Sequence, residues 1–308
     1  MPTNLQYALC GIVALLIVST LAIGLRALIK PNAGDAELWL RMGSWWVIAG
    51  LFVLAIALGR AFSIVYFCLI SFLALKEFLS IIPARPADKR LHYLAYLAVP
   101  LQYCWIWLGW NSLFFIFIPV YLFLMMSFFL MLAGEMQGFL KAASSLHWGL
   151  TATVFLISHV AFLLALPNSG NPAAGNAGLL VFIVFLTQFN DVLQFIWGKL
   201  LGKTKIVPKI SPSKTLAGLL GGLISTILLA WLLAPYLTPF LSWEPLAAGV
   251  IIALGGFAGD VLISAIKRDI GIKDTSKLIP GHGGILDRID SLIVSAPLFF
   301  YFVYYLHY

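Results

Sequence analysis

The residues whose types and spacing could do chemistry gather in one stretch, residues 260–290. The glycine-rich turn at 281–284 lets the backbone approach a ligand closely, and its amides can hold anionic oxygens. Asp287 and Asp290 share a face if a helix has begun there. Their oxygens suit magnesium, which is usually bound together with substrate phosphates. A basic membrane loop would explain the neighbouring cations but not this spacing, so the stretch favours a metal-bound polyphosphate and an anionic lipid headgroup.

Two carboxylates lie inside apolar segments. Asp191 is found in TQFNDVLQF and Asp260 in GGFAGDVLISAIKRD. Because an acidic side chain in a bilayer is costly, each indicates a functional site. The alternative is a hydrogen bond between two helices, which would be purely structural.

A second polar stretch, residues 198–222, carries Ser211, Lys214 and Thr215 just before a glycine-rich apolar segment. The free amides at the start of a helix attract phosphate. The GxxxxGK[ST] pattern of a nucleotide-binding P-loop is absent. The stretch therefore indicates either a phosphate contact or a plain basic loop.

These polar stretches must be positioned by membrane helices, because 62% of the 308 residues are hydrophobic and only 10% are charged. A soluble domain has about 45–50% apolar and about 25% charged residues. Backbone groups in lipid must satisfy one another, so the apolar segments should be helices. We predict an all-α, polytopic transmembrane helical bundle of nine to ten spans, since the pair flanking Gly59 could form one bent helix. The spans are 6–29, 44–58, 61–82, 91–109, 112–133, 146–166, 177–199, 215–236, 246–267 and 291–306.

The basic residues predict the orientation. With ten spans, 18 of the 19 Lys and Arg residues fall nearest to alternate loops, and only Arg60 falls on the opposite side. Basic loops stay in the cytoplasm. We therefore expect an inner-membrane protein with a cytoplasmic site, and we read the net charge of +7 as orientation rather than nucleic-acid binding.

The composition changes near residue 187, after which Gly, Lys, Asp and Ser concentrate around two loops. This favours a division into residues 1–186, a set of scaffold helices with a lipid-facing or dimer surface, and residues 187–308, a catalytic region.

The stretch from residue 264 to residue 290 resembles the long C-terminal motif of the phosphatidate cytidylyltransferase family. That motif has a serine, a KR pair, a KD pair, a small residue, a Pro-x-His-Gly-Gly turn and an Asp-Arg-x-Asp sequence. Its fixed positions are met by Ser264, Lys267, Arg268, Lys273, Asp274, Ser276, Pro280, His282, Gly283, Gly284, Asp287, Arg288 and Asp290.

The second stretch is similar to another part of that family, with Asp191, two Gly-Lys pairs and Ser211-Pro-Ser-Lys-Thr215-x-x-Gly. Ser213 stands where the family usually has a lysine, and NDVLQFIWG replaces the commoner DTGAYxxG-like sequence. The resemblance covers residues 187–300. The two departures indicate a divergent branch and leave the lipid acceptor open.

The resemblance implies transfer of a cytidylyl group from CTP to phosphatidic acid in the membrane, with Mg2+ and a second, monovalent cation such as K+. It places the metal on Asp260 and Asp287, and catalysis on these two with Lys267 and Arg288. A homodimer is also implied. Substrate binding would involve Asp191, Ser211, Lys214, Thr215, Ser264, Arg268, Lys273, His282, Gly283, Gly284 and Asp290.

Two other functions fit a chain with polar groups in membrane helices. A transporter would also carry intramembrane acids, but transporters usually bind near the midplane between related halves, whereas the polar residues here crowd one face. A CTP-dependent, polyprenol-type lipid kinase would move the γ-phosphate instead of the cytidylyl group. The complete C-terminal motif favours cytidylyl transfer over both.

Overall fold

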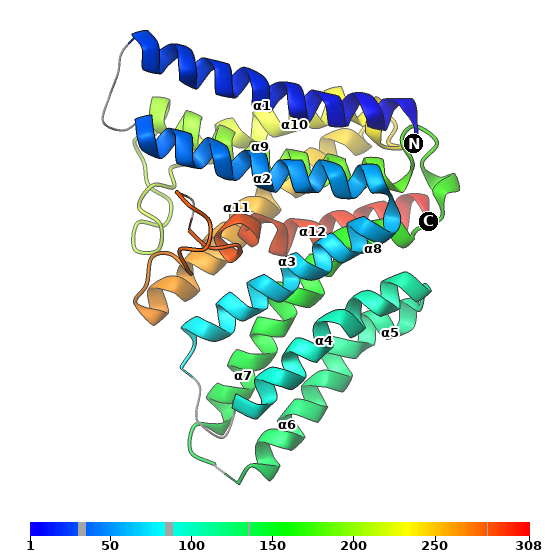
Figure 1. Ribbon diagram of the computed structural model, residues 1–308, viewed down its shortest axis with the longest axis vertical. Coiled ribbons are helices and arrows are strands. Elements are labelled where there is room, and N and C mark those ends of the chain that lie inside the picture. Colours follow the sequence, from blue (N-terminus) through cyan, green and yellow to red (C-terminus); the bar gives the residue numbers. More distant parts are fainter. Residues whose placement is uncertain (30–34, 84–88, 135, 282) are drawn as a thin grey trace.

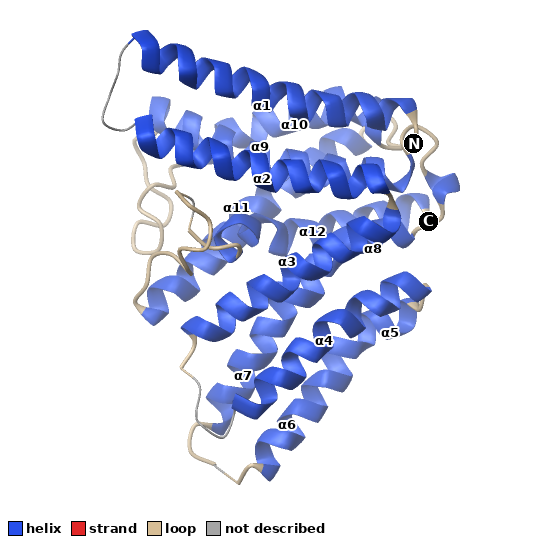
Figure 2. Ribbon diagram, in the orientation of Figure 1, coloured by secondary structure: helices blue, strands red, loops and turns tan. Residues whose placement is uncertain are grey.

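The computed structural model describes residues 1–29, 35–83, 89–134, 136–281 and 283–308, and in these ranges every regular element is a helix (Figure 2). Nine helical segments of the described chain are long and apolar enough to cross a membrane. This confirms the predicted all-α, polytopic bundle. The nine segments are α1 (Thr3–Ile29), α2 (Asp35–Leu58), α3 (Arg60–Ile81), Asn111–Leu132, Phe139–Ala165, α9 (Gly175–Leu201), α10 (Leu216–Leu237), α11 (Glu244–Ile270) and α12 (Leu286–His307).

Two of these segments contain irregular turns. The first consists of α5 (Asn111–Ile116), η2 (Phe117–Leu122) and α6 (Phe123–Leu132). Here η2 is a π-helix that includes Pro119, whose missing N–H disrupts regular α-helical bonding. The second consists of α7 (Phe139–Leu150), η3 (Thr151–Leu156), α8 (Ile157–Phe162) and η4 (Leu163–Ala165), and a short 3-10 turn, η5 (Asn168–Gly170), follows it.

The region around Gly59 forms two helices rather than one bent helix. Gly59 has φ 102°, which lies in the region that favours glycine, and the chain reverses there from α2 into α3. A further long helix, α4 (Lys89–Leu108), begins with a Lys-Arg pair and is not among the nine apolar segments. Both termini lie at the same end of the bundle, opposite the loop that joins α11 to α12 (Figure 1). This arrangement agrees with ten crossings.

The helices spread as a fan in which α4, α5 and α6 lie farthest from α1 and α10 (Figure 1). Helices α9, α10, α11 and α12 form the closely packed part, with α9 against α10 and α11 against both α10 and α12. The loops at 202–215 and 271–285 emerge from the same end of these helices. The fold therefore gathers the two polar stretches at one end of the bundle.

Glycine allows α11 and α12 to approach unusually closely at this end. A Cβ atom at Gly259 would fall on the backbone carbonyl oxygen of Asp290, and one at Gly255 would lie 2.9 Å from the Cα of Ser295. Any larger residue would force the helices apart. The contact places Asp260 on α11 beside Asp290 on α12.

Candidate active site

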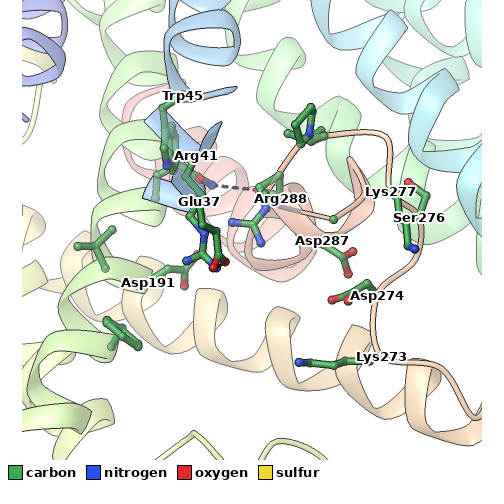
Figure 3. Close-up of a pocket in the computed structure, with 17 residues that line it drawn as sticks. Glu37, Arg41, Trp45, Asp191, Lys273, Asp274, Ser276, Lys277, Asp287 and Arg288 are labelled. Carbon is green, nitrogen blue, oxygen red and sulfur yellow. Dashed lines mark hydrogen bonds and ion pairs between the residues drawn. The ribbon is translucent and has the colours of Figure 1, made fainter. Parts of the chain in front are cut away.

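A polar cavity of about 740 Å³ opens where α2, α9, α12 and the 271–285 loop meet. Figure 3 shows the side chains of α2 and α9 on one side, those of the loop on the other, and Asp287 and Arg288 between them in this view. Four cations and four carboxylates line the wall, a composition that suits a metal-bound polyanion. They are Arg41, Lys273, Lys277, Arg288, Glu37, Asp191, Asp274 and Asp287.

Asp287 lies in the first turn of α12 and is 8% exposed. Its Oδ1 accepts a hydrogen bond from the Lys267 ammonium at 2.6 Å. Its Oδ2 accepts from the Thr275 amide, the Thr275 hydroxyl and the Gly284 amide, each at 3.0 Å. The carboxylate thus joins α11, the loop and α12, and a cation bound there would have to take the place of Lys267.

Asp260 forms a second ion pair, with Lys214 from the 202–215 loop. The Lys214 ammonium lies 2.5 Å from Asp260 Oδ2 and 3.3 Å from the side-chain oxygen of Gln194, to which it donates. Asp260 Oδ1 accepts from the hydroxyl of Ser264 at 3.2 Å. The predicted metal pair, Asp260 and Asp287, is therefore engaged by two different lysines.

The ammonium of Lys214 is held in its charged form. Burial disfavours the charge, but the carboxylates of Asp260 and Asp191 outweigh burial and raise the pKa of Lys214 above its ordinary value of 10.5. Lys214 is thus a fixed positive charge at the end of the loop, suited to an anionic oxygen.

Asp191 and Asp290 complete an acidic cluster with Asp260. The three carboxylates interact electrostatically, although they come from α9, α11 and α12. Asp191 Oδ2 accepts from the Ser291 hydroxyl at 2.8 Å, while its Oδ1 is buried and has no hydrogen-bond partner among the described residues. Such an orphaned acceptor is costly unless a ligand or ion completes it.

The donor set fits a hard cation such as magnesium, since it consists of carboxylate oxygens and includes one unsatisfied atom, Asp191 Oδ1. As they are arranged, no three or more His, Cys, Asp or Glu side chains of the described residues form a metal-binding cluster. A metal would therefore be completed by substrate phosphates and by movement of Lys214 or Lys267.

The remaining predicted site residues fall into three groups. Lys273 and Gly283 line the cavity. Thr215 caps α10 by accepting from the Gly218 amide at 3.1 Å, and the Arg268 guanidinium donates to the carbonyl of Ile210 at 3.1 Å, so both hold loops in place. Ser211 lies on the surface 3.3 Å from Ser213, and His282 lies outside the described residues.

The N-terminal helices contribute residues to the site that the sequence pattern did not predict. Glu37, Arg41 and Trp45 of α2 line the cavity, and the Ser44 hydroxyl donates to the carbonyl of Pro280 at 2.8 Å. Their only signal in the sequence was the pairing of Glu37 and Arg41 four residues apart, which forms an exposed ion pair at 2.5 Å.

An apolar slot of about 140 Å³ lies next to the polar cavity. The two spaces share Trp45, Gln188 and Arg288 as lining residues. Beyond them the slot is walled by residues from α1, α2, α3, α8, α9 and α12, among them Ala49 and Ile157. A ligand that fills both spaces must have a charged end and a hydrocarbon end.

The chain is similar in sequence to known cytidylyltransferases. A sequence model described as the cytidylyltransferase family matches residues 39–306. The chain is 44% identical to the uncharacterized protein YnbB of Escherichia coli K12 over 98% of this chain and 99% of YnbB. It is 35% identical to the phosphatidate cytidylyltransferase of Mycobacterium leprae over 54% of this chain and 51% of that protein, and 38% identical to the one of Haemophilus influenzae over 41% and 46%.

The chain belongs to the cytidylyltransferase family. The resemblance seen at residues 264–290 is thereby confirmed at the level of the family. The matches to the phosphatidate cytidylyltransferases span about half the length of those proteins, whereas the match to YnbB is end to end. This pattern is the one expected of a divergent branch.

Proposed function

We propose that the chain transfers the cytidylyl group of CTP to phosphatidate, giving CDP-diacylglycerol and pyrophosphate for phospholipid synthesis. One observation carries the proposal: a polar cavity rich in charged side chains adjoins an apolar slot, and Trp45, Gln188 and Arg288 line both spaces. Nucleotide phosphates suit the first space and an acyl chain suits the second. The named relatives act on phosphatidate, which supports this acceptor.

The chemistry requires positioning more than proton transfer. An oxygen of the lipid phosphate is already anionic near neutral pH, so it can attack the α-phosphorus of CTP without a strong base. The new P–O bond forms as the bond to the β-phosphate breaks and pyrophosphate leaves. The main barrier is the approach of two polyanions, which fixed cations lower. Arg288, which lines the cavity, and Lys214 and Lys267, which pair with Asp260 and Asp287, are the cations proposed for this role.

We propose Asp260 and Asp287 as the residues that would hold magnesium, with a monovalent cation such as K+ beside it. When bound, magnesium would neutralise charge on the triphosphate. Lys214 and Lys267 would then leave these carboxylates and contact phosphate oxygens. Asp191 and Asp290 would remain beside Asp260 as the other carboxylates of the acidic cluster while the lysines move.

The site would face the cytoplasm of an inner membrane, since the basic loops 202–215 and 271–285 lie at one end of the bundle. CTP would enter from that side while the acyl chains stay in the bilayer. The lining of the cavity by α2 supports lateral entry of the lipid beside that helix. We also propose a homodimer, which rests on the family resemblance alone.

One assay separates the candidate functions. Purified protein in detergent–lipid micelles is given phosphatidate, magnesium and CTP labelled at either the α- or the γ-phosphate. Label from the α-position in the lipid phase supports cytidylyl transfer, whereas label from the γ-position would identify a lipid kinase. No transfer in either case, combined with solute flux in liposomes, would identify a transporter.

Replacing Ala49 with Trp is expected to raise KM for long-chain phosphatidate about tenfold and to leave KM for short-chain phosphatidate nearly unchanged. Ala49 is half-buried and lines the slot, so a large ring there would fill the space proposed for the acyl chain. The matched control is Leu51→Trp, on the same helix but 52% exposed. Equal changes for both chain lengths would contradict the assignment of the slot.

A further inference from the structure

Glu77 is a buried carboxylate of α3 that belongs to none of the predicted site residues. It is 6% exposed, and it reaches the 271–285 loop and the first residues of α12. Its Oε1 accepts from the Ser276 hydroxyl at 2.6 Å and from the Ile285 amide at 2.9 Å. Its Oε2 accepts from the Leu286 amide at 2.9 Å and from the Thr275 hydroxyl at 3.2 Å.

These donors come from both ends of the loop whose middle lines the polar cavity. Thr275 and Ser276 lie before the cavity-lining residues Lys277, Ile279 and Pro280, and Ser276 itself lines the cavity. Ile285 and Leu286 lie after the last lining residue of the loop, Gly283. The Glu77 side chain, from the N-terminal half of the chain, therefore holds the two ends of the loop together by hydrogen bonds. The negative charge also lies at the start of α12, where free amides and the helix dipole favour an anion.

A shared hydroxyl connects Glu77 to the proposed metal ligand Asp287. Thr275 Oγ1 lies 3.2 Å from Glu77 Oε2 and 3.0 Å from Asp287 Oδ2. A hydroxyl has one proton to donate, so its position responds to both carboxylates. The backbone at Gly284 approaches this contact so closely that a Cβ atom would overlap Thr275 Oγ1 and Glu77 Oε2.

We propose that Glu77 is a positioning residue for the reaction: it fixes the 271–285 loop and, through Thr275, the orientation of the Asp287 carboxylate. This inference rests on the proposed function for its kinetic consequence. Its structural consequence, an ordered loop, does not depend on that function. The donors explain why a carboxylate is required, since the Ser276 hydroxyl and the Ile285 and Leu286 amides, with the shared Thr275 hydroxyl, need an acceptor-only group.

Two variants and a control test the proposal. Glu77→Gln keeps the size of the side chain but turns an acceptor into a donor that faces other donors. We expect kcat to fall about 10- to 100-fold, with KM for CTP changing less, as for groups that orient a metal ligand. Glu77→Asp keeps the charge and should recover part of the loss. Lys76→Gln, at the neighbouring exposed position, should behave as the parent.

Limited trypsin digestion supplies a readout that needs no activity. Cleavage after Lys273 and Lys277, both exposed, should accelerate at least about tenfold in Glu77→Gln, while cleavage after Lys141, exposed in the first turn of α7, stays unchanged. Ser276→Ala, which removes one donor, should give a smaller acceleration and guards against failure of the first variant to fold.

The outcomes are distinguishable. If Glu77 only joins the two halves of the bundle, all cleavage sites and Tm will change together and kcat per folded molecule will stay normal, which overturns the proposal. If the parent protein transfers no cytidylyl group, the proposed function fails. The digestion pattern then still decides whether Glu77 orders the loop.

Discussion

Replacing Asp287 with Asn is expected to lower kcat at least about 1000-fold while the protein still inserts into the membrane. The amide retains one acceptor and presents a donor to Lys267 or to the amides of Thr275 and Gly284, which are themselves donors. Lys267 would also lose its counter-charge in a site where it is 8% exposed. Loss of a buried charge partner and of a proposed metal ligand together justify the large effect.

Asp269→Asn is the matched control for this variant. Asp269 is an exposed acid in the last turn of α11, only two residues from Lys267, and it does not line the cavity. Its replacement should leave the rate within about twofold of the parent. Measured turnover of Asp287→Asn near that of the control would refute a role for Asp287 in catalysis.

Replacing Lys214 with Gln is expected to lower kcat/KM for CTP about 100-fold. The side chain is the ammonium that pairs with Asp260 at 2.5 Å, and its loss leaves the carboxylates of Asp260 and Asp191 without this neutralising charge when the triphosphate approaches. Lys209→Gln serves as the control, because Lys209 is exposed in the same loop. Equal losses in the two variants would show that only the overall charge of the loop matters.

The ion pair of Lys214 and Asp260 predicts how the stability difference between the parent and Lys214→Gln depends on pH. Since the pKa of Lys214 is raised by its carboxylate neighbours, the ion pair stabilises the fold fully below the ordinary pKa of 10.5 and is lost as pH rises through the raised pKa. The difference in Tm between the parent and Lys214→Gln should thus be equal at about pH 7 and about pH 9. A difference that shrinks over this interval would mean that Lys214 already loses its proton there.

The fold could be predicted from the sequence because long apolar segments in lipid must satisfy their own backbone hydrogen bonds and therefore form helices. Each predicted span corresponds to a helix or to a run of helical turns, and the break at Gly59 was visible as a candidate. Most ends differ by five residues or fewer, but the segment predicted at 146–166 begins at Phe139. The start of α2 at Asp35 rather than at residue 44 was not predicted, because its first turns are polar. Those polar turns are the ones that reach the cavity.

The site was predicted only where its residues are close in sequence. The stretch from Ser264 to Asp290 supplied Asp287, Arg288 and Lys273 because the motif is continuous. Glu77 gave the same signal as Asp191, an acid within an apolar segment, yet its partners lie about 200 residues away. Periodicity and spacing do not report such distant pairs. Helix packing alone brings them together.

The distance along the chain between Glu77 and its four donors has a consequence for biosynthesis. Helix α3 enters the membrane early in translation, whereas Thr275, Ser276, Ile285 and Leu286 emerge only with the last tenth or so of the polypeptide. Contacts between such remote segments form late, since a long loop must close first. A nascent chain halted before α12 would therefore carry the Glu77 carboxylate without the backbone amides of Ile285 and Leu286 that it accepts from in the complete fold.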